Sequence, residues 1–401
     1  MSTADRLARS GEQFLTEGRL DQAAESFRSA LLEDARHPGA QLGLARLSMG
    51  LGLSQEAGEL LDRLRKKSPR NAEGLVLRAL VAEGSGDLEL ALDLFADAVA
   101  AAPSAAFTRY QHGRALCVAR RFEQAVPELQ AAASLEPKAV SVHYALGVAH
   151  RELERLGDSI AAFTKALEID PRFADCYLTL ADVLCEAQRE PLAEKLLKQG
   201  RALLPESGAL CDKLAAVSLK LGDSRGAVEA LRALTVTNPT EDAFVSLATV
   251  ALGAGDAKSA ASAIDRLLSD FPKSWRGHHL KSMLLDTADQ LEPAIAELRE
   301  AHRLAPQEWR PLNDLGTLLN ARSLAEQAGQ DEAGEVLEQA ADLAPAHELA
   351  PRYNLGLAYW NAGRPRDARR VIQRMLDDAP EGHPVTAQAQ QFLEAVRRAE
   401  R

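Results

Sequence analysis

The sequence predicts an all-α fold, a solenoid of antiparallel helix pairs stacked side by side. The first observation is a regular series of prolines, which end helices. Six of them recur at one constant interval: Pro69, Pro103, Pro137, Pro171, Pro205 and Pro239. The second is a pair of small residues at a fixed separation within the unit, for example Gly113 and Ala125. The 401-residue chain is therefore expected to contain about 11 copies of one unit.

Each unit is expected to form one helical hairpin. In the fifth unit, packing residues recur at i, i+3, i+4 and i+7 over residues 143–150, and a similar helical spacing of i, i+3, i+6 and i+7 follows over residues 160–167. Gly157 and Asp158 are expected to break the chain between these two helices. Pro171 is expected to end the second helix, because proline lacks an amide hydrogen and disfavours helix in its predecessor.

A large apolar residue follows the second small residue of each unit by four positions. The small side chain lets two helices approach, and the large one fills the space between them. These large residues are Phe27, Leu61, Phe95, Leu129, Phe163, Leu197, Leu231, Ile264, Leu298, Leu337 and Ile372.

Together with the closing proline, this pattern resembles the tetratricopeptide repeat over residues 4–380. The resemblance implies a right-handed superhelical solenoid whose first helices line a concave groove that holds peptides or other proteins. Leu7, His143 and Cys211 depart from the family pattern, which usually has a large aromatic residue at their position. The pentatricopeptide family, which reads RNA, has a similar repeat length, but the acidic charge and the regular register of the prolines argue against it.

The tenth unit is longer than the others. Gly316 and Ala333 are separated by five more positions than the two small residues of the other units, so the unit carries an insertion within residues 320–329. Its composition predicts a prolonged first helix that ends at Gly329. Such an insertion either contributes to binding or is a neutral change in a surface turn.

The repeat register ends after residue 380. Four residues then form one apolar stripe: Val385, Ala389, Phe392 and Val396. We expect a C-terminal capping helix over residues 384–400, which covers the open face of the last repeat.

The charge of the chain bears on its partners. The formal net charge is −11, with 58 acidic residues against 47 Lys and Arg. Binding to nucleic-acid phosphates needs a basic face, so no nucleic-acid partner is expected. The sequence shows neither a secretory signal nor an apolar run long enough for membrane insertion, so the expected location is cytoplasmic. The four cysteines are expected to be reduced thiols.

The motifs of catalysis are not found, and we expect neither an enzyme nor a cofactor. His112, His143 and His150 are the histidines that could converge on a metal ion. Each of them lies where the repeat places packing residues, so we interpret them as partly buried histidines and expect no metal site.

Two stretches of the groove are candidates for partner binding. In the fourth and fifth units, the stripe about 120° from the packing face places aromatic residues beside arginines, a combination enriched in binding hot spots. The candidates here are Phe107, Tyr110, Arg114, Tyr144, Val148 and Arg151. Tyr144 alternatively packs between neighbouring first helices.

The second stretch lies in the tenth and eleventh units and is rich in asparagine. An asparagine amide donates to and accepts from a peptide backbone at the same time. The candidates here are Asn313, Thr317, Asn320, Tyr353, Asn354 and Trp360, with Tyr353 and Trp360 as anchors.

The sequence thus predicts a protein–protein interaction scaffold or adaptor that binds a protein or peptide in its concave groove. The alternative is an accessory subunit that recruits substrate to a separately encoded transferase or envelope-assembly enzyme. A further alternative is self-association, in which the partner is a second copy of this chain.

Overall fold

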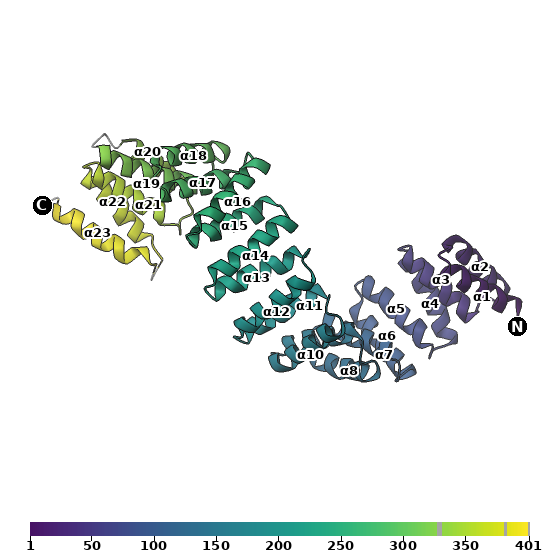
Figure 1. Cartoon of the computed structure of the whole chain (residues 1–401). Coiled ribbons are helices and arrows are strands. Elements are labelled where there is room, and N and C mark those ends of the chain that lie inside the picture. Colours follow the sequence, from purple (N-terminus) through teal and green to yellow (C-terminus); the bar gives the residue numbers. More distant parts are fainter. Residues whose placement is uncertain (327–330, 381–382, 400–401) are drawn as a thin grey trace. The chain divides into compact units, whose positions relative to one another are not determined.

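The computed structural model describes residues 1–326, 331–380 and 383–399, and every regular element within those ranges is an α-helix (Figure 1). Consecutive helices pack on one another in sequential pairs. The predicted fold class, an all-α array of helix pairs, is confirmed. The contacts divide the chain into two compact units, residues 1–204 and residues 205–401.

The first unit consists of six helical hairpins. Its helices are α1 (Thr3–Thr16), α2 (Leu20–Glu33), α3 (Pro38–Gly50), α4 (Ser54–Lys67), α5 (Ala72–Gly84), α6 (Leu88–Ala101), α7 (Ala106–Val118), α8 (Phe122–Leu135), α9 (Val140–Glu152), α10 (Leu156–Ile169), α11 (Ala174–Glu186) and α12 (Glu190–Leu203).

The described part of the second unit contains five hairpins and one final helix. Its helices are α13 (Gly208–Lys220), α14 (Ser224–Thr237), α15 (Glu241–Gly253), α16 (Ala257–Asp270), α17 (Trp275–Thr287), α18 (Leu291–Leu304), α19 (Trp309–Glu326), α20 (Asp331–Leu343), α21 (Ala350–Asn361), α22 (Pro365–Asp377) and α23 (Val385–Ala399).

The pairing of small and large residues is confirmed as the packing device of the hairpin. Phe163 is fully buried, and a Cβ atom added to Gly147 would lie 2.6 Å from its ring. A Cβ on Gly113 would likewise meet Leu129 at 2.6 Å. The first helix therefore approaches its partner closely only because its contact residue is small.

The predicted break at Gly157 is wrong by a few positions. Gly157 lies inside α10, and the turn between α9 and α10 comes earlier, at Leu153–Arg155. Glu154 provides the reversal there, because its φ of 57° lies in the left-handed region. Glycine takes this conformation in other hairpins, for example at Gly86, with a φ of 85°.

The first helix of the tenth hairpin is long. α19 has 18 residues, whereas α17 has 13. The expected end of this helix, Gly329, lies outside the described residues. Arg322, within the added turn, forms ion pairs with Glu292 of α18 and Glu332 of α20.

The last helix, α23, covers the final hairpin. Ala389 and Leu393 of α23 are buried in one apolar cluster with Ile372 and Met375 of α22. α23 therefore shields this end of the apolar core from water.

Two of the groups considered for chemistry, His150 and Cys176, lie in the interior. His150 is buried, and burial lowers its pKa. Burial also raises the pKa of Cys176 to about 12, so its thiol stays protonated at neutral pH. Over the described ranges, no three side chains of His, Cys, Asp or Glu are arranged to hold a metal ion.

Candidate functional site

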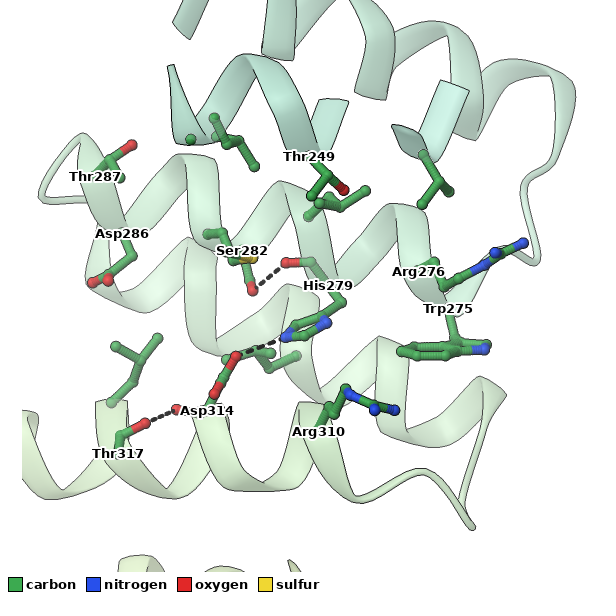
Figure 2. A pocket seen from close by; sticks show the side chains of 17 residues that line it. Thr249, Trp275, Arg276, His279, Ser282, Asp286, Thr287, Arg310, Asp314 and Thr317 are labelled. Carbon is green, nitrogen blue, oxygen red and sulfur yellow. Dashed lines mark hydrogen bonds and ion pairs between the residues drawn. The ribbon is translucent and has the colours of Figure 1, made fainter. Parts of the chain in front are cut away.

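A groove of about 980 Å³ crosses three successive first helices of the second unit (Figure 2). We call it the α17 groove, because α17 forms its centre and α15 and α19 form its two sides. Each helix presents residues at intervals of three or four, which share one helix face. On α15 these are Val245, Thr249 and Leu252.

The central part of the groove is apolar. Leu280 and Leu298 are buried beneath it, and Leu318 of α19 is half-buried at its side. Met283 of α17 also lines the groove and is 43% exposed. A flexible thioether that remains open to water adapts to the shape of an incoming apolar side chain.

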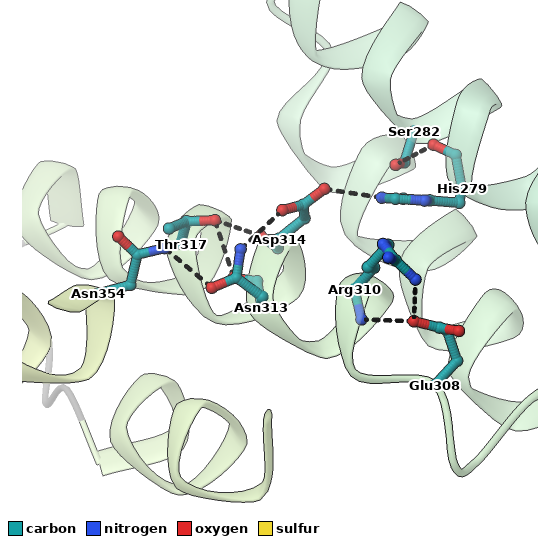
Figure 3. Close-up of polar contacts among 8 residues, drawn as sticks. All are labelled: His279, Ser282, Glu308, Arg310, Asn313, Asp314, Thr317 and Asn354. Atoms are coloured by element: carbon teal, nitrogen blue, oxygen red, sulfur yellow. Dashed lines mark hydrogen bonds and ion pairs between the residues drawn. The ribbon is translucent and has the colours of Figure 1, made fainter. Parts of the chain in front are cut away.

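A hydrogen-bonded pair joins α17 to α19 across the groove (Figure 3). His279 Nε2 lies 2.7 Å from Asp314 Oδ2. Because a carboxylate only accepts, Nε2 must carry the hydrogen. The Nδ2 of Asn313 donates to Asp314 Oδ1 at 3.0 Å, so both carboxylate oxygens are used. The indole of Trp275 stacks on the His279 ring at 6.2 Å between centroids.

Two arginines lie at the end of the groove that Trp275 marks (Figure 2). Arg276 is paired with Glu241 at 3.1 Å and with Asp242 at 2.7 Å. Burial alone would lower the pKa of Arg276, but the hydrogen bonds to these carboxylates outweigh it and raise the pKa. Both acids belong to α15, so the Arg276 ion pairs also link neighbouring repeats.

Arg310, the second arginine, is paired with the residue just before α19. Its Nη1 donates to Glu308 Oε1 at 2.9 Å (Figure 3). Its guanidinium also lies 5.0 Å from the centre of the Trp309 ring. Neither arginine is therefore an unpaired cation.

The predicted asparagine stretch is used to join helices. Asn313 is 9% exposed, and its Oδ1 accepts from Asn354 Nδ2 of α21 at 2.9 Å (Figure 3). Asn361 Nδ2 donates to Asn320 Oδ1 at 3.3 Å, which repeats the link nearer the other end of both helices. Thr317 donates to backbone carbonyls of its own helix and lines the α17 groove.

The two predicted aromatic anchors are partly covered by the chain itself. Phe392 of α23 makes edge contacts with Tyr353 at 6.2 Å and with Trp360 at 6.0 Å. The rings therefore hold the final helix in place.

The arginines of the candidate stretch in the first unit are also paired. Arg114 donates to both carboxylate oxygens of Glu83 on α5, and these bonds raise its pKa. Arg151 binds Glu186 of α11 in the same way. Like Arg276, each joins its repeat to a neighbour.

The aromatic residues of this stretch differ in their surroundings. The Tyr144 ring lies 5.4 Å from Phe163 and 5.0 Å from Phe173, and its hydroxyl is 3.2 Å from Thr179 Oγ1, which favours the packing alternative. Tyr110 packs against the core, and Val148 is half-buried. Phe107 is 58% exposed.

Sequence reasoning missed most of the α17 groove. Of the twelve predicted contact residues, Thr317 lines it. The signal was present, because the stripe that holds Tyr144 in the fifth unit returns with the same spacing in the ninth. There it consists of Arg276, His279, Met283 and Asp286. Those positions attract less notice in sequence because no tyrosine, tryptophan or phenylalanine is among them.

An array of helix pairs whose first helices line an apolar groove is a helical-repeat protein. Models described as tetratricopeptide repeat match residues 14–81 and 150–217 in one case, and residues 110–172, 213–274, 245–308 and 353–393 in the other. The chain belongs to the tetratricopeptide repeat family.

Three similar proteins are known by name or structure. The chain is 23% identical over 150 residues to anaphase-promoting complex subunit 3 of Schizosaccharomyces pombe, a match that covers 37% of this chain and 23% of the relative. It is 22% identical over 189 residues to BBSome complex member BBS4 of Bos taurus, covering 47% of this chain and 36% of the relative. The chain thus matches about a third or less of each relative's length.

The third similarity is structural. The C-terminal part of a TPR repeat-containing protein from Cytophaga hutchinsonii superposes with a TM-score of 0.51 at 16% identity, covering 60% of this chain and 99% of that one. This supports the fold. The matched family models describe repeats and identify no catalytic domain. Across the described residues, no helix combines the length and the apolar character that crossing a membrane requires.

Proposed function

We propose that the chain is a protein-interaction scaffold that binds a segment of a partner protein in the α17 groove. The observation that carries the proposal is the apolar centre of the groove, where Met283 stays open to water beside Leu318. Polar groups around this centre are largely bonded to one another, so an apolar side chain enters without leaving them unpaired.

The dimensions of the groove favour a chain segment as the ligand. Packed helices lie about 8–10 Å apart, so three successive first helices span roughly 20 Å. An extended chain covers that distance with about six residues. Both curated relatives are named as members of complexes, which agrees with a scaffold role.

Site-specific photo-crosslinking tests the proposal in the full chain. A photoreactive amino acid at Thr249, an exposed residue on the α15 side, should crosslink in native cells to one defined segment of a partner. Met283→Glu should abolish that crosslink, because it buries a charge against the apolar centre.

Leu32→Glu is the matched control, since Leu32 of α2 is 87% exposed and lies in the first unit. Crosslinks that survive Met283→Glu, or that Leu32→Glu removes equally, would contradict the assignment of the groove.

A further inference from the structure

We propose that the α17 groove selects a basic segment, in which a large apolar side chain is followed closely by Lys or Arg. This deepens the proposed function and rests on it. The apolar side chain sits against Met283 and Leu318, and the cation pairs with Asp286.

The charge around the groove is negative. Two arginines, Arg276 and Arg310, line the groove, whereas five carboxylates belong to the lining or are paired with it. These are Glu241, Asp242, Asp286, Glu308 and Asp314. An acidic surface of this kind raises the local concentration of a cationic segment and speeds its association.

Most of these charges already have a partner. Arg276 and Arg310 are held by Glu241, Asp242 and Glu308, and Asp314 is held by His279. An acidic partner would therefore have to break an existing ion pair before it could bind either arginine.

Asp286 is the exception. It is an exposed residue of the lining, and among the described residues its carboxylate has neither a side-chain hydrogen bond nor an ion pair. Figure 2 shows it with Thr287 at one end of α17, away from Trp275, Arg276 and Arg310. It follows Met283 by three positions, so both residues lie on neighbouring parts of one helix face.

The placement of Asp286 fixes what the bound segment has to supply. A partner that covers Met283 removes water from the adjacent carboxylate, and a desolvated carboxylate needs a cation or a donor. Lys and Arg provide this with long, flexible side chains that reach past the apolar contact. A second carboxylate at that place would be repelled.

Peptide selection on the full-length protein tests the proposal. The probe is a phage-displayed library of random dodecamers, selected against the native chain and counter-selected against the Met283→Glu variant. We expect enriched peptides with Leu, Ile, Met or Phe and with Lys or Arg within four positions of it. Enriched peptides without basic residues, or with acidic ones, would overturn the charge selectivity while leaving the groove as a binding site. No enrichment over the Met283→Glu variant would overturn the proposed function as well.

A matched pair of variants then locates the cation. For the best selected peptide, Asp286→Asn should weaken binding by about three- to tenfold at low salt, in the range of a partly exposed ion pair. Replacing the basic residue of the peptide by Gln should give a similar loss, and combining both changes should add little.

Asp289→Asn is the control. Asp289 is exposed three positions further on with a φ of 54°, a conformation that Asn also adopts, so this change removes one charge without straining the turn. Equal losses for both variants would show that general charge, and not Asp286, controls binding.

Discussion

His279 and Asp314 are 35 residues apart in sequence, yet their side chains lie 2.7 Å apart because they occupy the facing sides of successive first helices. Both residues line the α17 groove. The bond therefore shapes the site and couples two repeats. We expect the double-mutant cycle of His279→Ala and Asp314→Ala to show a coupling of about 0.5–1.5 kcal/mol. Native-state hydrogen exchange of α17 and α19 measures it, and additive single effects would contradict it.

Two glycines in one hairpin should respond in opposite directions to alanine. Gly147→Ala places a methyl group 2.6 Å from the Phe163 ring, and we expect a loss of about 1–3 kcal/mol from overpacking. Gly157 lies in α10 with no atom within 4 Å of an added Cβ, so Gly157→Ala should stabilise by about 0.5–1 kcal/mol. Urea unfolding of both variants provides the measurement. The same sign for both would contradict the packing described here.

Glu297 of α18 should make the fold sensitive to acid. Burial alone would raise its pKa, but hydrogen bonds from Lys281 and His278 outweigh burial and hold the pKa below its ordinary value of 4.5. A carboxyl with a lowered pKa in the folded state stabilises the fold above its unfolded pKa, and the contribution is lost as pH falls through the folded value. At pH 7 the native chain should therefore have a higher melting temperature than the Glu297→Gln variant. This difference in melting temperature should shrink below about pH 4.5. A constant difference from pH 7 to pH 3 would exclude this cause.

Phe392 of α23 should control the environment of Trp360. In a background with Trp275→Phe and Trp309→Phe, Phe392→Ala should shift the Trp360 emission to longer wavelength, because the edge contact at 6.0 Å is lost. The melting temperature should also fall, since Phe392 packs on the last apolar cluster. Arg397→Ala serves as the control, because Arg397 is exposed and bonds to Gln373 instead. An unchanged emission would show that α23 does not shield Trp360 in solution.

The helix pairs and their packing were predictable because they depend on contacts within one unit. The contact between Gly147 and Phe163 lies inside one hairpin and recurs in the same form along the chain. The turn at Glu154 was not predictable in the same way. No sequence pattern identifies a glutamate that adopts a positive φ. Gly157 nearby suggested a break in the chain, but it lies within α10.

The candidate site was harder to predict because its side chains are fixed by neighbouring repeats. Arg114 looks available in sequence, but Glu83, 31 residues earlier, binds it. The amide of Asn354 similarly bonds to Asn313 across 41 residues. Which polar residue meets which depends on how successive helices are displaced along their axes, and repeat spacing alone does not give that displacement.

The polar links between successive first helices also have a mechanical consequence. Arg114 with Glu83, Arg151 with Glu186 and His279 with Asp314 each join one repeat to the next. Tension along the stacking direction of either unit would act on every interface between its repeats, and at these interfaces the polar pair shares the load with the apolar side chains packed around it. A polar pair that is pulled apart while its two helices stay folded keeps its partners close in space, so it can form again when the tension falls.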